Sequence, residues 1–213
     1  YRPKKADENS FPIKNIQFKE VPYTREQHEF FYNFMASDLD ISGLRLLFSL
    51  EHKSDAQVEL MSSSIQDKYK NLPGSGREIG NLLFKKDKHM YVFPKKYIEI
   101  DKLLRLKREQ TVIYSNYKKN GVESLASFLE MRGHGSIFKR LTPEMTSKEM
   151  QDTIGSYNRG ETNVLILDPE VIEGVSLNGT RVLHVLEPPL NVTQLDQVIG
   201  RTVRYHSHHH LPK

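Results

Sequence analysis

The chain of 213 residues contains no cysteine. Without thiols it can form no disulfide framework, no thiolate zinc site, no iron–sulfur cluster and no cysteine nucleophile. A reducing compartment is therefore permitted by the composition, although nothing in the composition requires one.

Long hydrophobic runs are lacking as well. No stretch of about 18 apolar residues occurs, and the beginning, Tyr-Arg-Pro-Lys-Lys, has no apolar segment of the kind found in signal peptides. We therefore expect no membrane partner. The sequence does not begin with methionine, and we interpret it as part of a longer protein.

Neither positive nor negative charge is in large excess. There are 31 Lys and Arg against 27 Asp and Glu, which gives a formal charge of +4. An isoelectric point near 9.1 suits a polyanionic partner such as nucleic acid, but exposed lysines are common on any solvated surface. Hydrophobic residues make up 37% of the chain, which is enough to bury a core and excludes a collagen-like chain.

The residue pattern changes near residue 110, and we predict two parts, residues 1–105 and 106–213. In the first part apolar residues are scattered among polar and basic ones, which favours a mainly helical extension. Alternating apolar residues predict a strand at residues 16–21, and helical spacing predicts helices at 25–36, 39–50 and 98–108, with Thr24 capping the first.

A basic stretch lies between these elements. Five lysines, at positions 85, 86, 88, 95 and 96, surround the sequence Met-Tyr-Val-Phe-Pro at residues 90–94. The stretch could be a basic and aromatic patch for a phosphate backbone, or a short solvated strand with flanking lysines. We favour the solvated strand.

In the second part, short β-branched runs alternate with helical patterns. The runs predict strands at residues 111–114, 136–138, 163–167 and 181–186. Helices are predicted at 122–131, closed by Gly133, at 142–157, stopped by Gly160, and at 192–203. This alternation predicts an α/β fold with a parallel sheet and helices on both faces, whose ligands bind at the carboxyl ends of the strands.

The last predicted helix carries the most informative motif, Gln-Val-Ile-Gly-Arg-Thr-Val-Arg at residues 197–204. Helical spacing places Gln197, Arg201 and Arg204 on one face, and Gly200 allows close approach to that face. Two guanidinium groups suit a triphosphate, because each binds phosphate oxygens through two hydrogen bonds and stays charged. An amphipathic helix whose arginines pair with carboxylates would explain R-x-x-R alone.

A second signal follows the third predicted strand, in the sequence Glu-Val-Ile-Glu-Gly-Val-Ser-Leu at residues 170–177. Gly174 would let backbone groups meet a ligand, and a carboxylate such as Glu173 can receive a ribose hydroxyl. Taken alone, an ordinary strand-to-helix turn explains this segment equally well. The two signals together favour a ligand site.

As a set, these segments resemble the second RecA-like domain of superfamily 2 helicases and translocases. Residues 112–117 resemble motif IV, residues 164–177 motif V and residues 197–204 motif VI, in the order and spacing of that family. The resemblance covers about residues 106–213 and implies a RecA-like fold for them.

A narrower resemblance reaches into the first part. Residues 19–23, 77–84 and 92–94 and the tail at 204–208 resemble the nucleic-acid-dependent ATPases of large cytoplasmic DNA viruses. The types it matches are the small subunit of the poxvirus early transcription factor and nucleoside triphosphate phosphohydrolase I, and an African swine fever virus homologue would fit.

The resemblance to superfamily 2 implies roles for the motif VI residues. Arg201 and Arg204 would reach across an interdomain cleft to the nucleotide phosphates, with Arg204 as the arginine finger that offsets charge on the transferring phosphoryl group. Gln197 would organise that face of the helix and Gly200 would give clearance.

It also implies binding roles elsewhere. Glu173 and Gly174 would border the nucleotide, as Gln197 and Gly200 would. Three residues of the motif IV segment would lie toward the nucleic acid: Ser115, Asn116 and Tyr117.

Two motifs of a complete ATPase are lacking. There is no G-x-x-x-x-G-K-[ST] phosphate loop and no D-E-x-[HD] metal box. In the family both belong to the first RecA-like domain, which we expect to precede residue 1. We therefore expect ATP and Mg²⁺ to be the cofactors of the full-length protein, with the Mg²⁺ ligands in that first domain, and we expect the isolated chain to be inactive.

Four histidines follow the motif VI segment, at positions 206, 208, 209 and 210. Imidazoles bind zinc or nickel, and a purification tag would look similar, but Ser207 interrupts the run and Leu-Pro-Lys follows it. We interpret the run as native sequence and predict no metal site.

The leading hypothesis is the C-terminal lobe of a virus-encoded, ATP-dependent helicase or translocase that acts in viral transcription, in the virion and the cytoplasmic factory of the infected cell. Its expected partners are nucleic acid, DNA rather than RNA, the first RecA-like domain of the same chain, and viral RNA polymerase or other transcription factors. Two alternatives stay open: a duplex DNA translocase without strand separation, and a noncatalytic binding or scaffold domain of a transcription factor.

Overall fold

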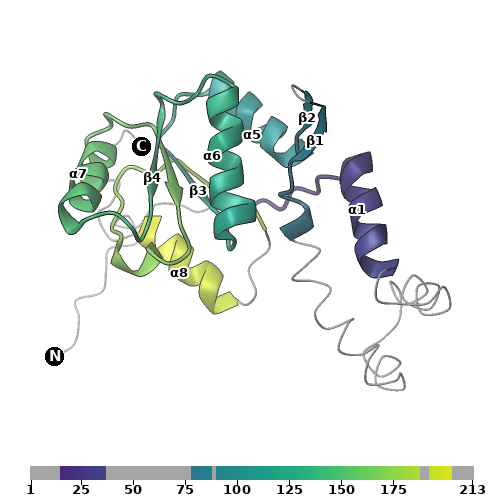
Figure 1. The fold of residues 1–213 in the computed structure, drawn as a ribbon. Helices are drawn as coiled ribbons and strands as arrows, with labels where there is room; N and C mark the ends of the chain where they lie inside the picture. Colours follow the sequence, from purple (N-terminus) through teal and green to yellow (C-terminus); the bar gives the residue numbers. More distant parts are fainter. Residues whose placement is uncertain (1–14, 37–77, 88–89, 188–191, 203–213) are drawn as a thin grey trace, which may run out of the picture. The chain divides into compact units, whose positions relative to one another are not determined.

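The computed structural model describes residues 15–36, 78–87, 90–187 and 192–202 (Figure 1). The chain divides into two compact units. One consists of Pro22–Lys95, and the other combines Tyr1–Val21 with Lys96–Lys213. The predicted division at residues 105 and 106 stays a prediction, as does the predicted helix at 39–50, which lies outside the described residues.

The unit Pro22–Lys95 contains helix α1 (Arg25–Ala36) and an antiparallel pair of strands, β1 (Phe84–Asp87) and β2 (Met90–Val92). The predicted start of α1 is confirmed, because the Thr24 hydroxyl accepts a hydrogen bond from the Gln27 N–H at 3.2 Å. The Gln27 side chain accepts one from the Thr24 N–H at 2.9 Å in return, so two N–H groups of the helix start are satisfied.

The other unit contains four strands and the helices that connect them. In chain order, these elements are α5 (Lys95–Leu106), β3 (Thr111–Tyr114), the π-helical turn η2 (Lys118–Glu123), α6 (Ser124–Met131), β4 (Phe138–Leu141), α7 (Ser147–Asn158), β5 (Val164–Leu167), the 3-10 turn η3 (Ile172–Gly174), β6 (Val182–Val185) and α8 (Val192–Thr202).

The four strands form one parallel sheet in the order β4-β5-β3-β6. At its centre Tyr114 of β3 lies opposite Leu167 of β5 and Val185 of β6. The carboxyl ends of these strands therefore meet at a single edge. The predicted α/β fold with a parallel sheet is confirmed.

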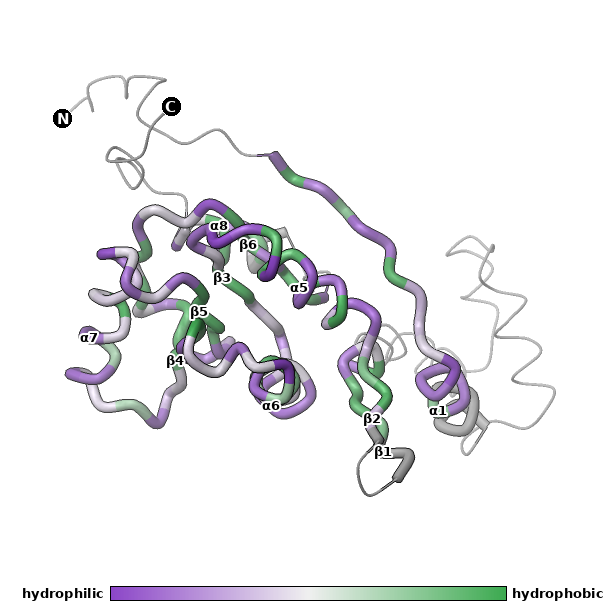
Figure 2. The backbone as a smooth tube through the Cα atoms, turned by 90° about the horizontal axis from the view of Figure 1, so that it is seen from above, coloured by the Kyte–Doolittle hydropathy of each residue, from purple (hydrophilic) through white to green (hydrophobic). Residues whose placement is uncertain are grey.

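Helices cover both faces of the sheet, as predicted. Figure 2 looks down on the layers and shows α7 and α8 on one side of the strands and α5 and α6 on the other. Because side chains alternate along a strand, Val112 and Tyr114 of β3 pack in the cluster that holds Tyr157 of α7 and Val198 of α8. On the opposite side, Tyr97 of α5 contacts Phe128 of α6 with 5.6 Å between ring centroids.

Glycines end two helices where the sequence predicts. Gly133, after α6, has a φ of 82° and Gly160, after α7, has a φ of 76°. A left-handed backbone is common just beyond a helix and is open mainly to glycine. Among the described helices, none combines the length and the hydrophobicity that crossing a membrane requires.

Three local predictions are wrong. Residues 16–21 form no strand, and Phe18 is 87% exposed, so the alternating pattern has no buried face to serve. The strand predicted at 136–138 begins only at Phe138. Helix α7 begins after Thr146 rather than at Thr142, since Thr146 and Glu149 exchange the two hydrogen bonds of a capping box.

The sequence predicts an apolar side of α5 with Leu103, Leu104 and Leu106 and a solvated side with Lys102, Arg105, Lys107 and Arg108, and this prediction is partly wrong. Leu103 and Leu106 are exposed, whereas Tyr97, Ile100 and Asp101 are buried with Leu104. The helix therefore turns a face toward the sheet that contains a carboxylate, which apolar spacing alone does not reveal.

Candidate functional site

The carboxyl edge of the sheet brings together the segments that follow β3, β5 and β6. Ser115 and Asn116 come directly after β3, Asp168 follows β5, and Glu187 lies two residues beyond β6. The parallel register places all of them at the same edge. This is the edge at which open α/β sheets bind ligands.

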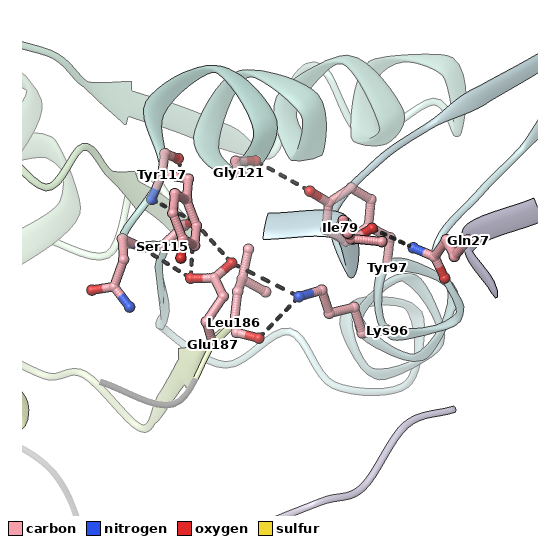
Figure 3. Close-up of polar contacts among 10 residues, drawn as sticks. Gln27, Ile79, Lys96, Tyr97, Ser115, Tyr117, Gly121, Leu186 and Glu187 are labelled. Atoms are coloured by element: carbon pink, nitrogen blue, oxygen red, sulfur yellow. Dashed lines mark hydrogen bonds and ion pairs between the residues drawn. The ribbon is translucent and has the colours of Figure 1, made fainter. Parts of the chain in front are cut away.

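Glu187 is the centre of the polar contacts at this edge, and its side chain is fully buried (Figure 3). The Ser115 hydroxyl lies 3.0 and 3.1 Å from the two carboxylate oxygens, and the Asn116 N–H donates to Oε2 at 3.0 Å. A buried carboxylate is tolerated only when donors and an opposite charge surround it. Both are present here, because Lys96 supplies the charge.

Lys96 approaches Glu187 from α5. Its Nζ lies 3.8 Å from Glu187 Oε1 and donates a hydrogen bond to the Leu186 carbonyl at 3.1 Å. Burial lowers the pKa of Lys96, and the charge of Glu187 acts in the opposite direction. Neither prediction for the basic stretch fits this residue, because Lys96 is neither on an open patch nor solvated. The side chains of residues 85–90 lie outside the described part.

The segment Ser115–Asn116–Tyr117 is held in a tight turn. The Ser115 hydroxyl accepts a hydrogen bond from the Tyr117 N–H at 3.1 Å while it contacts Glu187. Ser115 is 1% exposed, so its side chain supports the turn from inside, whereas Asn116 and Tyr117 are half-buried at its surface. The predicted nucleic-acid contact therefore rests on Asn116 and Tyr117.

Gly121 packs against the same turn from η2. A Cβ on Gly121 would lie 2.0 Å from the Ser115 Oγ, which no side chain could tolerate without a shift. The Gly121 carbonyl also accepts a hydrogen bond from the Tyr97 hydroxyl at 3.3 Å (Figure 3). Burial raises the pKa of Tyr97 well above its usual value of 10. The neutral phenol therefore remains a donor at any ordinary pH.

The predicted nucleotide residues lie on α8 and η3, which pack against each other. The Leu177 N–H, just after η3, donates to the Arg201 carbonyl at 3.1 Å, and Leu177 is fully buried. Gln197 and Gly200 are exposed on α8, and Glu173 and Gly174 are exposed on η3. The structure thus brings these predicted residues onto adjoining elements. Arg204 lies outside the described residues.

Two features of this surface suit an anionic ligand. Arg201 is half-buried, and its guanidinium takes part in none of the ion pairs formed among the described residues. A Cβ on Gly174 or on Gly200 would meet no other described part of the chain within 4 Å. Because neither glycine needs a left-handed backbone, nothing in the described structure requires glycine at these positions.

These residues fit phosphate oxygens but not a metal ion. A guanidinium and an amide are hydrogen-bond donors, which phosphate accepts. In the described part of the chain, no group of three or more His, Asp or Glu side chains could hold a metal, and the histidines at 206–210 lie outside it.

Asp168, at the end of β5, carries a further polar group. It is fully buried, and its Oδ1 accepts a hydrogen bond from the Glu170 N–H at 3.1 Å, while Oδ2 has no partner among the described residues. Nearby, Lys118 pairs with Glu144, and this hydrogen bond raises the pKa of Lys118 and holds that of Glu144 at about 2. The Lys118–Glu144 pair links the segments that follow β3 and β4.

Sequence reasoning missed Glu187, Lys96 and Gly121. Glu187 stands in the segment after the fourth strand, where ligands are expected, but it carries no motif that distinguishes it from a surface acid. Ninety-one residues separate it from Lys96, since 187 − 96 = 91. Their contact becomes visible only when α5 is packed on the sheet.

Comparison with known proteins gives a family match over these elements. The helicase conserved C-terminal domain matches residues 95–206, which is more than half of the chain. The match begins at α5 and includes the whole sheet, η3 and α8.

Two viral relatives illustrate the similarity. "Putative ATP-dependent RNA helicase L538" of Acanthamoeba polyphaga mimivirus is 34% identical over 102 residues, which are 48% of this chain and 22% of that protein. "Nucleoside triphosphatase I" of Choristoneura biennis entomopoxvirus is 28% identical over 135 residues, which are 58% of this chain and 20% of that protein. The matched region is thus only about a fifth of each relative.

Among solved structures, the C-terminal domain of the DEAD-box protein Dbp5 superposes with a TM-score of 0.43 at 20% identity, covering 51% of this chain and 62% of that one. The α/β architecture is established here by the strand order and register.

Proposed function

This chain belongs to the helicase conserved C-terminal domain family and resembles the helicases and nucleoside triphosphatases of large DNA viruses, and from that premise we propose its function. It is the C-terminal lobe of an ATP-dependent helicase or translocase that moves on nucleic acid. Its motif VI helix, α8, contacts the nucleotide, and the turn after β3 contacts the nucleic acid.

The observation that carries this proposal is the surface formed by α8 and η3. The Leu177 N–H, just after η3, donates to the Arg201 carbonyl and joins the two elements, on which Gln197 and Glu173 are exposed and Arg201 is half-buried. A guanidinium that pairs with no carboxylate of the described ranges is available for phosphate oxygens, and its fixed charge stabilises negative charge that develops during phosphoryl transfer. Arg204, three residues further along the sequence, is the proposed arginine finger.

The rest of the nucleotide site belongs to the first RecA-like domain. Bound Mg²⁺ would neutralise the phosphate oxygens there, through ligands of that domain. In this chain, Gly174 and Gly200 leave clearance for the opposing surface, and Glu173 can accept a hydrogen bond from a ribose hydroxyl.

The nucleic acid is proposed to run along the carboxyl edge, against Asn116 and Tyr117. An amide and an aromatic ring can contact sugar, phosphate or base without a sequence requirement. We further propose duplex DNA as the substrate, a role in viral transcription with viral RNA polymerase as a partner, and action in the virion and the cytoplasmic factory.

A test of this proposal measures ATP hydrolysis by the full-length protein without nucleic acid and with duplex DNA, single-stranded DNA or RNA. We expect nucleic acid, duplex DNA most of all, to stimulate turnover, and we expect the isolated 213-residue chain to show none. A full-length protein with no turnover under any of these conditions would favour a noncatalytic scaffold.

A second pair of assays separates the two kinds of motor. Strand displacement reports a helicase, whereas triplex displacement without strand displacement reports a duplex translocase. Either positive result is consistent with the family, and the absence of both would contradict movement on nucleic acid.

A further inference from the structure

Neither Glu187 nor Lys96 belongs to the predicted motifs, but the pair holds the turn at the end of motif IV in place. Glu187 accepts hydrogen bonds from the first two residues after β3, the Ser115 hydroxyl and the Asn116 N–H. Glu187 itself comes directly before residues 188–191, which lead into α8. One buried carboxylate therefore ties the turn of motif IV to the strand that leads to motif VI.

The turn depends on this carboxylate for its backbone hydrogen bonding. If Glu187 were absent, the Asn116 N–H would lose its acceptor, and the Ser115 hydroxyl would keep only the Tyr117 carbonyl, at 3.2 Å. Buried donors without acceptors are rare, because the cost of desolvation is not recovered. The turn would therefore leave this conformation, and Asn116 and Tyr117 would leave their places at the carboxyl edge.

The positive charge of Lys96 offsets the desolvation cost of burying the Glu187 carboxylate. Its charge lies 3.8 Å from Glu187 Oε1, and its hydrogen bond to the Leu186 carbonyl fixes the end of β6 beside α5. The Lys96 side chain is only 18% exposed, and its ammonium group points to Glu187 and the Leu186 carbonyl, so it is not placed to bind a phosphate of the nucleic acid. Its effect on nucleic acid must pass through Glu187.

We infer that Glu187 and Lys96 are positioning residues that set the affinity of this protein for nucleic acid by holding the turn Ser115–Asn116–Tyr117. They act without touching nucleic acid or nucleotide. This inference rests on the proposed function, because it assumes that the turn contacts nucleic acid.

The experiment uses the full-length protein and measures ATP turnover against the concentration of duplex DNA. Glu187→Gln keeps the size of the side chain, but it removes the negative charge opposite Lys96 and leaves one neutral amide oxygen to accept from both donors of the turn, so these hydrogen bonds are weakened. We expect the DNA concentration for half-maximal stimulation to rise about tenfold or more. The turnover number at saturating DNA and the KM for ATP should stay within about twofold, because α8 is unchanged.

Lys96→Met is the second variant, and it keeps the aliphatic length without the charge. It should raise the half-saturating DNA concentration severalfold and should leave the salt dependence of DNA affinity unchanged. A lysine that contacts phosphate directly would instead lower the slope of log affinity against log salt by about one. The double variant should lose less than the product of the two single effects, since the paired charges are coupled.

Glu161→Gln is the matched control. It removes the same charge from an exposed ion pair with Arg159 and should change none of these quantities. Thermal melting of each variant reports whether the fold is retained.

The outcomes separate the inference from the function. If the wild-type protein shows no stimulation by nucleic acid, the proposed function fails and the inference falls with it. Three results with a stimulated wild type would overturn the positioning role and leave the proposed function standing. In the first, both variants keep the wild-type half-saturating DNA concentration; in the second, they lose turnover at saturating DNA instead. In the third, Lys96→Met lowers the slope of log affinity against log salt.

Discussion

Gly200 offers a test in which stability and activity should move in opposite directions. It lies in α8, is exposed, and would place a Cβ in open space. Glycine in a helix interior costs about 1 kcal/mol relative to alanine, because more backbone freedom is lost on folding. Gly200 stands in the last turn of a helix that ends at Thr202, so about half of that value, ~0.5 kcal/mol, is expected.

Gly200→Ala should therefore stabilise the 213-residue chain by about 0.5 kcal/mol, which corresponds to a rise of roughly 1–3 °C in melting temperature for a domain of this size. In the full-length protein the same methyl group occupies the clearance in which the nucleotide and the opposing domain are proposed to lie. We expect ATP turnover to fall about tenfold or more, which is about 1.4 kcal/mol of lost transition-state stabilisation.

Ser127→Ala provides the matched control. Ser127 is exposed on α6, and its replacement gains a similar helix propensity of about 0.5 kcal/mol without approaching the site. Denaturation followed by circular dichroism measures the first effect, and steady-state ATP hydrolysis measures the second. If Gly200→Ala stabilises the chain and leaves turnover at the wild-type rate, as Ser127→Ala should, then the surface above Gly200 is ordinary solvated helix.

Two further perturbations test the packing around the site and the charge network at the end of α5. Gly121→Ala should destabilise the chain by about 1–3 kcal/mol, because the new Cβ would lie 2.0 Å from the Ser115 Oγ; an unchanged denaturation midpoint would show that the turn moves freely. Burial raises the pKa of Asp101, but hydrogen bonds from His134, Arg132 and Arg105 outweigh it and leave the pKa below its usual 3.8. The stability that this carboxylate contributes is therefore present above about pH 4 and lost as the pH falls further, and Asp101→Asn should be less stable than wild type at pH 7 with a weaker decline between pH 4 and 2. Parallel acid denaturation curves for the two proteins would contradict this reasoning.

The elements of residues 106–213 could be predicted because their signals are local. Strands β3 and β5 are fully buried, so they are short apolar runs. The helices α6 and α7, which lie between them in the chain, end at Gly133 and Gly160, whose positive φ values favour glycine. Pattern and glycine position together are enough to predict a parallel sheet with helical crossovers.

The local errors arose where two signals competed. Thr142 and Thr146 both precede acidic residues, but only Thr146 has a glutamate exactly three positions later to complete a capping box, at Glu149. At residues 16–21 an alternating pattern was present, but a strand also needs a partner and a buried face, which no local pattern supplies.

The candidate site also has one part that could be predicted from the sequence and one part that could not. Gln197 and Arg201 follow from helical spacing, because residues four apart share a face. The support for the other half of the site could not be predicted, because Glu187 and Lys96 meet only through the packing of α5 on the sheet. A buried ion pair between distant residues leaves no periodic signal in the sequence.

The most direct test of the central claim is the rate of ATP hydrolysis by the full-length protein with saturating duplex DNA, measured for wild type, Arg201→Ala and Arg204→Ala alongside DNA binding. The account predicts that either substitution lowers turnover by at least a hundredfold, and that Arg204→Ala abolishes it, while the Kd for DNA stays within about threefold of wild type. Wild-type rates in both variants would contradict the claim that this chain supplies the arginines of an ATPase site.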